Sequence, residues 1–196
     1  MISDSNNNAN KFNRRAFMIT GCGVAAAIAL RLRLGVAPVA AKSGAPKEVK
    51  VIEFSAAGQR EDAVSLPMVV KTDAQWKQQL SRAAYEITRE AGTERPYSGQ
   101  YWNLHEKGIY RCICCDTALF SSDTKFESGT GWPSFWQAIA KENVREITDP
   151  SLGMERTAVS CRLCDAHLGH VFDDGPKPTG LRYCMNSVAF KFVKSA

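Results

Sequence analysis

The sequence predicts a mainly β fold that has short helices near its N-terminal side and one metal site joining its strands. Three observations predict it. After Gly108 the chain runs as short β-forming segments separated by Gly, Pro and Asp, which is typical of antiparallel sheets. Before them, apolar residues recur at helical spacing over residues 73–89. Two C-x2-C pairs, in the segments CICC and CRLC, provide the staple that a small β domain needs.

Residues 1–41 predict an export signal of the twin-arginine type. Arg14 and Arg15 precede Phe17, and an apolar run, Ile19 to Leu30, follows them. That run is shorter than the about 20 residues that cross a bilayer, and small residues at the end of the segment provide a processing site. We therefore expect a cleaved signal, a periplasmic or secreted mature chain, and no stable membrane association after cleavage.

The charge of the chain argues against a nucleic-acid-binding protein. The formal net charge is +5, but residues 1–41 hold five basic side chains and one acidic one. The remainder has 20 basic and 19 acidic side chains, a net charge of +1. A near-neutral domain lacks the basic surface that binds phosphates. Its partners are therefore expected to be small molecules or proteins, and the chain itself a monomer.

Residues 42–64 allow two interpretations. Their mixed composition is typical of a linker or a loosely attached N-terminal arm, yet EVKVIEF (48–54) alternates roughly as a first strand does. The folded domain is expected over residues 65–196. In it, Asp73 is a plausible N-cap for one or two short helices that end near Arg89. The apolar positions at helical spacing are Trp76, Leu80, Ala83, Ala84 and Ile87.

Six segments after Gly108 are predicted as strands, because each is short, rich in β-forming residues and bounded by turn residues. They are IYRC (109–112), TALF (117–120), REI (145–147), ERTAVSC (155–161), GHVF (169–172) and LRYCMNSVAFKFV (181–193).

The cysteine pairs predict a structural zinc site. Two residues separate Cys112 from Cys115 and Cys161 from Cys164, and this spacing lets two thiolates on one tight turn occupy neighbouring corners of a tetrahedron. Because the pairs lie far apart in the sequence, the site would join distant parts of one domain. Four thiolates leave no open position on the metal, so the chemistry must lie elsewhere.

Two alternatives compete with zinc. An oxidising compartment favours disulfides, but C-x2-C pairs close poorly as structural disulfides, and twin-arginine export carries folded proteins that can bind zinc beforehand. A redox-active C-x2-C motif would need a βαβ context, which the sequence lacks. Cys114 does not reproduce the pair spacing and is expected to be a spare thiol.

Cys184 is the candidate nucleophile. In a strand through LRYCMN, the period of two places Arg182, Cys184 and Asn186 on one face and apolar side chains on the other. A nearby guanidinium favours the thiolate, which is the reactive form. The alternative is core filling, the commoner role of a single cysteine in a strand.

Two histidines and an aromatic loop accompany this cysteine in the sequence. HLGH holds His167 and His170 just beyond the second cysteine pair, where they are suited to donate protons at neutral pH. Trp132, in the Gly-flanked segment GWPSF, is expected to line a cleft as a flat apolar wall for a methyl-bearing ligand. Phe135 of the same segment completes the predicted substrate-binding set.

Four segments together resemble the methionine-R-sulfoxide reductase B family over about residues 66–193: GTERPYSGQYW, YRCICCDTALF, KFESGTGWPSFW and CRLCDAHLGHVFDDGPKPTGLRYCMNS. The resemblance implies a β-tent-like fold of two antiparallel sheets with short N-terminal helices and a zinc on four cysteines. It also implies that the Cys184 thiolate attacks the sulfur of a methionine R-sulfoxide and becomes a sulfenic acid. His170, assisted by His167, would protonate the leaving oxygen. Arg182 would hold the thiolate, Asn186 would hydrogen-bond in the site, and Trp132 would hold the ε-methyl group.

One position departs from the family pattern. Many members carry a resolving cysteine just before GWPSF, where this chain has Thr130, so the usual disulfide with Cys184 cannot form. We expect a thioredoxin-like or other external thiol to reduce the sulfenic acid; the competing hypothesis is that Cys114 resolves it. The expected substrates are oxidised proteins containing methionine sulfoxide, and the free amino acid. A rival class is a non-catalytic zinc-stapled β module whose Trp132 pocket binds a ligand, which would need no reactive Cys184.

Overall fold

A computed structural model describes residues 47–55, 57–149 and 156–195 of the chain. In chain order its strands and helices are β1 (Glu48–Phe54), β2 (Arg60–Pro67), α1 (Asp73–Gln79), α2 (Arg82–Glu90), β3 (Gly108–Cys112), β4 (Ala118–Ser121), β5 (Lys125–Phe126), β6 (Ser134–Phe135), β7 (Val144–Asp149), β8 (Arg156–Cys161), β9 (His167–Phe172), β10 (Arg182–Met185) and β11 (Phe190–Lys194).

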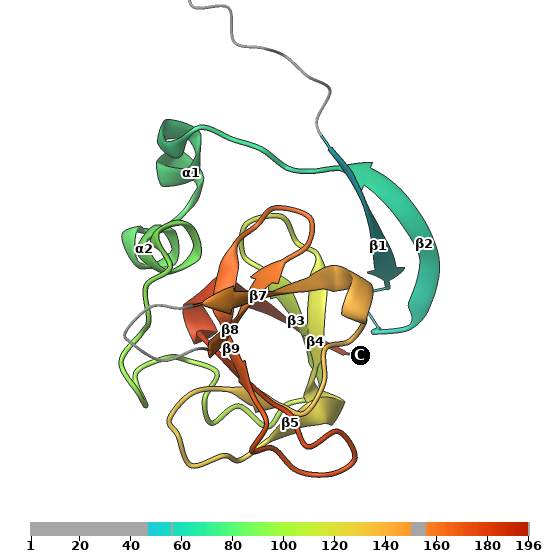
Figure 1. The fold of residues 1–196 in the computed structure, drawn as a ribbon, viewed down its shortest axis with the longest axis vertical. Helices are drawn as coiled ribbons and strands as arrows, with labels where there is room; N and C mark the ends of the chain where they lie inside the picture. Colours follow the sequence, from blue (N-terminus) through green and yellow to red (C-terminus); the bar gives the residue numbers. More distant parts are fainter. Residues whose placement is uncertain (1–46, 56, 150–155, 196) are drawn as a thin grey trace, which may run out of the picture. The chain divides into compact units, whose positions relative to one another are not determined.

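Antiparallel pairing organises these strands into two sheets and a hairpin. The larger sheet has the order β5-β6-β10-β9-β8-β7, the smaller sheet has the order β11-β3-β4, and β1 pairs with β2. Figure 1 shows α1 and α2 on one side of the sheets and the β1–β2 hairpin on the other. The predicted mainly β fold with antiparallel sheets and short helices is therefore confirmed. The prediction missed β2, and it also missed β5 and β6, which are too short to show a pattern.

The last predicted segment, residues 181–193, divides into strands of different sheets. β10 lies inside the larger sheet and β11 at an edge of the smaller one. Between them a 3-10 turn at Ser187–Ala189 (η4) redirects the chain. Val188 and Ala189 remain partly or fully buried through this turn. Because the apolar pattern continues across it, the sequence does not show the break.

The two helices begin at hydroxyl caps. Thr72 is the N-cap of α1 and forms a capping box, so the predicted cap at Asp73 is wrong by one residue. Ser81 caps α2, and its position explains why one apolar stripe becomes two helices. From the last turn of α2, Arg89 donates a 2.8 Å hydrogen bond to the carbonyl of Cys164. The helix is thereby attached to the second cysteine pair.

Residues 48–54 form a strand, which is one of the two interpretations that the sequence left open. Asn143, fully buried, holds β1 to the rest of the domain with its side-chain amide. Its Oδ1 accepts from the Ile52 N–H (2.7 Å), and its Nδ2 donates to the carbonyls of Ile52 and Ala118 (both 2.8 Å). The domain boundary expected at residue 65 falls inside β2.

Aromatic side chains from both sheets make the centre of the core. Phe135 of β6 stacks on Phe120 of β4 with ring centroids 4.6 Å apart, and it meets Tyr110 of β3 edge-on at 4.9 Å. Phe190 of β11 also packs against Phe135. Such pairs add to the free energy gained from burying the rings. They fix β6, and with it the neighbouring β10, against the smaller sheet.

The predicted export signal, residues 1–41, lies outside the described residues. Within the part of the chain that is described, no helix combines the length and the apolar character that a membrane span requires.

Candidate functional site

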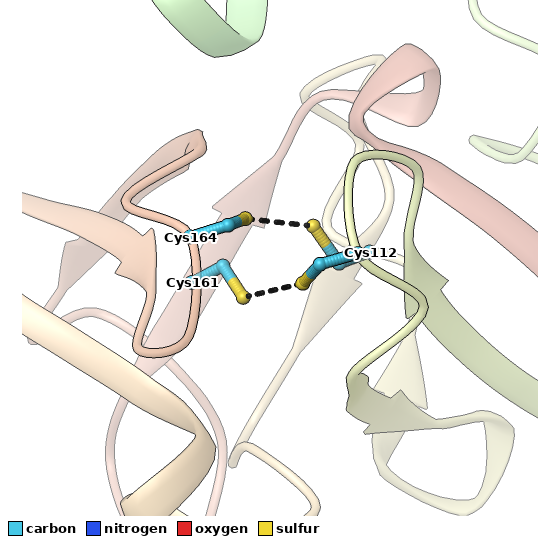
Figure 2. Close-up of side chains that lie close together, drawn as sticks. Cys112, Cys161 and Cys164 are labelled. Carbon is cyan, nitrogen blue, oxygen red and sulfur yellow. Dashed lines mark hydrogen bonds between the residues drawn. The ribbon is translucent and has the colours of Figure 1, made fainter. Parts of the chain in front are cut away.

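The two cysteine pairs meet at one point between the sheets. All four Sγ atoms of Cys112, Cys115, Cys161 and Cys164 lie within 4.8 Å of one another. The Sγ atoms of Cys112 and Cys164 are 3.6 Å apart, and those of Cys115 and Cys161 are 3.5 Å apart. Figure 2 shows the side chains of Cys161 and Cys164 pointing toward the turn that carries Cys112. A tetrahedral zinc with bonds of about 2.3 Å has sulfur atoms about 3.8 Å apart. The donor set therefore fits a structural metal, and every cysteine of the described ranges is free of disulfides.

The turns that carry the two pairs have the same backbone design. The N–H of Asp116 donates to the carbonyl of Cys112 (2.9 Å), and that of Asp165 donates to Cys161 (3.0 Å). Both aspartates adopt a left-handed conformation, with φ of 63° and 55°, which Asp tolerates better than most residues. Each turn thus presents its two sulfurs in the same way, as the shared spacing predicts.

Cys114 lies apart from Cys184. Its side chain is buried, and its sulfur is 3.5 Å from the Thr88 hydroxyl on α2. It does not line the pocket that contains Cys184. A resolving role for Cys114 would require the domain to open, so the structure disfavours that hypothesis.

The register of the larger sheet collects polar side chains on one face. Cys184 lies opposite His170 of β9 on one side and Ser134 of β6 on the other. Two residues along, Arg182 lies opposite Phe172 on the same face. The other face presents Tyr183 and Met185 to the core, as the alternation predicts.

A pocket of about 140 Å³ opens above this face. Its walls include Trp132, His170, Cys184 and Asn186, together with Phe172 and Arg156. The indole of Trp132 is half-buried, so it lines the pocket in the manner that the sequence predicts. Side chains from four separate segments of the chain therefore surround one half-buried thiol.

The electrostatics of Cys184 differ from the expectation. Burial raises the pKa of its thiol above the ordinary value, and the opposing effects of the Thr130 hydroxyl and the Arg182 guanidinium are smaller. Arg182 also shares its charge with Asp174 through two hydrogen bonds of 2.9 and 2.8 Å. Burial thus opposes ionisation of Cys184 more strongly than Arg182 favours it, whereas the sequence predicted a thiolate maintained by Arg182.

Asp149 is a functional candidate that sequence reasoning missed. Its Oδ2 lies 2.9 Å from Nε2 of His170 and 3.1 Å from the guanidinium of Arg156. A carboxylate on Nε2 orients the imidazole and favours a proton on that nitrogen. The only sequence signal was an acidic residue two positions beyond the predicted strand 145–147, and acidic residues are common on surfaces.

His167 is less suited to proton transfer than predicted. It is buried, and its ring meets that of His170 edge-on with centroids 5.3 Å apart. Burial, and next the neighbouring His170, lower the pKa of His167 to about 4. The ring is therefore neutral near pH 7 and packs against that of His170.

Glu94, also missed, ties two walls of the pocket together. Its N–H donates to Oδ1 of Asn186 (3.0 Å), and its carbonyl accepts from the indole N–H of Trp132 (3.1 Å). Its carboxylate accepts from the backbone N–H groups of Ser187 (2.6 Å) and Val188 (3.2 Å) at the start of η4. These partners lie 38 to 94 residues away, so no local pattern could reveal them.

One predicted substrate-binding residue is wrong. Phe135 is fully buried in the aromatic core and faces away from the pocket, opposite Tyr183. It supports β6 without reaching a ligand. Conversely, Gly169 does line the pocket, and a Cβ there would overlap the carbonyl oxygen of Cys184. Only glycine lets β9 approach β10 this closely beside the thiol.

The chain is similar to a known domain family and to several named proteins. A model of the SelR domain matches residues 80–194. The chain is 58% identical over 124 residues to a peptide methionine sulfoxide reductase MsrB of Herminiimonas arsenicoxydans, which covers 63% of this chain and 90% of that protein. It is 57% identical over 121 residues to the protein of that name in Thioalkalivibrio sulfidiphilus, covering 62% of this chain and 88% of the relative. A chloroplastic peptide methionine sulfoxide reductase B1 of Arabidopsis thaliana is 48% identical over 161 residues, 82% of this chain and 75% of its own length.

Proposed function

Because this chain belongs to the SelR domain family, with relatives named peptide methionine sulfoxide reductase, we propose that it reduces methionine R-sulfoxide to methionine. The substrates are oxidised proteins and the free amino acid, and the reaction repairs oxidised methionine. The observation that carries the proposal is the pairing of Cys184 with His170 across two strands, in a pocket that Trp132 lines.

In the first step the sulfur of Cys184 attacks the sulfoxide sulfur. The thiol and the sulfoxide are converted into a sulfenic acid and a thioether, so the oxygen moves from methionine to Cys184: the cysteine sulfur is oxidised, the sulfoxide is reduced, and no further oxidant is needed. When the sulfoxide binds, its ε-methyl group packs on the indole of Trp132. The carbonyl of Glu94 holds this indole in place. Because the pocket is small, it suits the end of a methionine side chain better than a larger group.

His170 supplies the proton for the oxygen that leaves methionine. Asp149 holds Nε2, which leaves Nδ1 as the nitrogen available to the pocket. A carboxylate behind the ring fixes its orientation toward the pocket, as in other acid catalysts that a carboxylate orients. Proton delivery to the sulfoxide oxygen makes its sulfur more electrophilic, so Cys184 can attack without being ionised beforehand.

An external thiol restores the enzyme. One thiol condenses with the sulfenic acid to a mixed disulfide and water, and a second thiol releases Cys184 by exchange. The absence of a cysteine at position 130 and the burial of Cys114 support this route. A thioredoxin-like protein or a small thiol is the reductant, and the enzyme acts as a monomer.

Zinc on the four cysteines would have a structural role. An ion held by all four sulfurs would have no position left for substrate, and it would join the turn after β3 to the turn between β8 and β9. The metal would hold the two sheets in register, and the reacting groups all come from side chains elsewhere.

The enzyme works in the periplasm or outside the cell, after export by the twin-arginine pathway and removal of residues 1–41. The paired arginines, the short apolar run and the near-neutral charge of the remainder support this location. A pathway that carries folded proteins also lets zinc bind in the reducing cytoplasm.

The test uses Cys184→Ser and a matched control, Cys114→Ser. The purified zinc protein is assayed with the R and S epimers of methionine sulfoxide under dithiothreitol, with zinc measured on the same sample. We expect reduction of the R epimer only, its loss in Cys184→Ser with zinc content unchanged, and its retention in Cys114→Ser. Full turnover in Cys184→Ser would refute the proposal and favour a non-catalytic binding module.

A further inference from the structure

Thr130 contacts the candidate nucleophile from the loop before β6, and the proposed mechanism gives it no role. Its Oγ1 is 3.9 Å from Sγ of Cys184. This is a long contact for the thiol, and one that can tighten when the sulfur gains charge. Threonine also brings a hydroxyl to the place where a cysteine would bring a second thiol.

The loop around Thr130 is fixed from both sides. Gly129 and Gly131 adopt left-handed conformations with φ of 71° and 88°, which glycine reaches without strain. Tyr97 then holds both glycines: its hydroxyl donates to the carbonyl of Gly129 (2.6 Å), and its N–H donates to that of Gly131 (2.8 Å). The Thr130 hydroxyl is therefore positioned by the loop before any ligand binds.

Two serines continue from Thr130 toward the core. Oγ of Ser128 lies 2.8 Å from Oγ1 of Thr130 and 2.7 Å from Oγ of Ser134. Ser134 is fully buried and is the cross-strand neighbour of Cys184. Each hydroxyl donates one proton, and Ser134 has two acceptors within reach: Oγ of Ser128 at 2.7 Å and the carbonyl of Trp132 at 3.3 Å. When its proton takes the shorter contact to Ser128, the order Ser134 to Ser128 to Thr130 directs the last donor at the sulfur of Cys184. Hydrogen bonds arranged in such a chain strengthen one another.

The charged groups near Cys184 are each held by another partner, so an additional hydrogen-bond donor can still stabilise an ionised sulfur. Arg182 is held by Asp174 through two hydrogen bonds, and His170 is held by Asp149, which also contacts Arg156. The Glu94 carboxylate is bound by backbone N–H groups of η4. Each cation around the sulfur therefore shares its charge with a carboxylate, while burial disfavours the ionised sulfur.

We propose that Thr130, supported by Ser128 and Ser134, is a catalytic hydrogen-bond donor to Cys184. The hydroxyl stabilises the negative charge left on the sulfur as the thiol loses its proton in the attack, and it afterwards binds the oxygen of the sulfenic acid until the external thiol arrives. Only this second role rests on the proposed function. The first concerns the reactivity of the thiol and can be measured without any sulfoxide.

The first experiment measures alkylation of Cys184 by iodoacetamide between pH 6 and 10 in the zinc-loaded chain, with Cys184 modification quantified by mass spectrometry. Thr130→Val preserves the shape and removes the hydroxyl, and Thr130→Ser preserves the hydroxyl. Hydrogen bonds to charged groups are worth enough to shift a pKa by about one unit. We therefore expect alkylation of Thr130→Val to be about tenfold slower near pH 7, a wild-type profile for Thr130→Ser, and a smaller shift in the same direction for Ser128→Ala.

Thr148→Val serves as the control, because Thr148 is exposed on β7 and its neighbour across the strands is Thr157, outside the Cys184 row. Zinc content identifies any variant that fails to fold. An alkylation profile of Thr130→Val that coincides with wild type, while Thr148→Val also does, overturns the donor role.

The second experiment follows the sulfenic acid after one turnover without reductant, using dimedone to trap it. We expect it to decay several-fold faster in Thr130→Val than in wild type, and an equal lifetime overturns the second role. If wild type reduces neither epimer, the proposed function fails, and the alkylation profiles still decide whether Thr130 donates to Cys184. If wild type reduces the R epimer and the alkylation profiles coincide, the Thr130 proposal fails alone.

Discussion

Replacing Glu94 by glutamine keeps the size of the side chain and removes the charge that holds η4. In the wild type, the carboxylate accepts from two backbone N–H groups, those of Ser187 and Val188. The single oxygen of glutamine can accept from one of them, and its NH2 group then faces the other donor. Because bonds to charged groups contribute about 1.5–3 kcal/mol and Glu94 is half-buried, we expect a loss of about 2 kcal/mol in the free energy of unfolding.

Such a loss lowers the melting temperature by roughly 4–8 °C in a chain of this size. The same loosening reaches the pocket through the backbone of Glu94, which binds Trp132 and Asn186. A loss of about 1 kcal/mol in the free energy of substrate binding raises KM for the R sulfoxide about fivefold. The rate of alkylation of Cys184 should change little, because Glu94 contacts Trp132 and Asn186 in the pocket walls and does not contact the thiol.

The assays are thermal melting by circular dichroism and steady-state reduction of the R sulfoxide under dithiothreitol. The control is Glu86→Gln, which breaks an exposed ion pair with Arg82 and should change the stability little, because solvent screens such pairs. The reasoning is refuted if Glu94→Gln melts and saturates with substrate as Glu86→Gln does.

Three further outcomes are expected. Cys161→Ser, or extraction of the metal by a chelator, should remove zinc and unfold the domain, because the metal joins both sheets; zinc content and circular dichroism measure this, and an unchanged melting curve without zinc would contradict it. Asp149→Asn should lower kcat about tenfold with little change in KM, since His170 loses the carboxylate that orients it; steady-state kinetics measure both, and an unchanged kcat would remove Asp149 from the mechanism. Acid should destabilise the wild type more than His167→Gln: burial lowers the pKa of His167 from 6.5 to about 4, so the unfolded chain takes up the proton first as pH falls through this window. Stability that is complete above about pH 6.5 then declines by about 3 kcal/mol toward pH 4; urea titrations at pH 7 and 4.5 test this, and equal losses in both proteins would count against it.

Much of the fold could be read from short-range patterns. The C-x2-C spacing predicts which four sulfurs meet, because two residues set the separation of two thiolates on one turn. Strand alternation predicts that Arg182 and Cys184 share a face and that Tyr183 lies in the core. The break at η4 escaped prediction because burial, and therefore apolar character, continues through it.

The residues of the candidate site likewise differ in whether the sequence alone could identify them. Cys184, His170 and Trp132 were identifiable because each lies in a segment whose local composition is unusual for its position. Phe135 was assigned to the ligand because GWPSF reads as one loop, whereas β6 begins inside it and turns the ring into the core.

Spacing and alternation therefore determine which side chains share one turn or one face of a strand, because bond geometry within a few residues fixes their directions. Which side chains arrive at the same place from far along the chain depends on how sheets pack, and Glu94, Asp149 and the hydroxyls behind Thr130 belong to that class. The protonation of Cys184 belongs there too. A thiol's pKa reflects everything that displaces water around it, and desolvation exists only once the distant segments have closed over the sulfur.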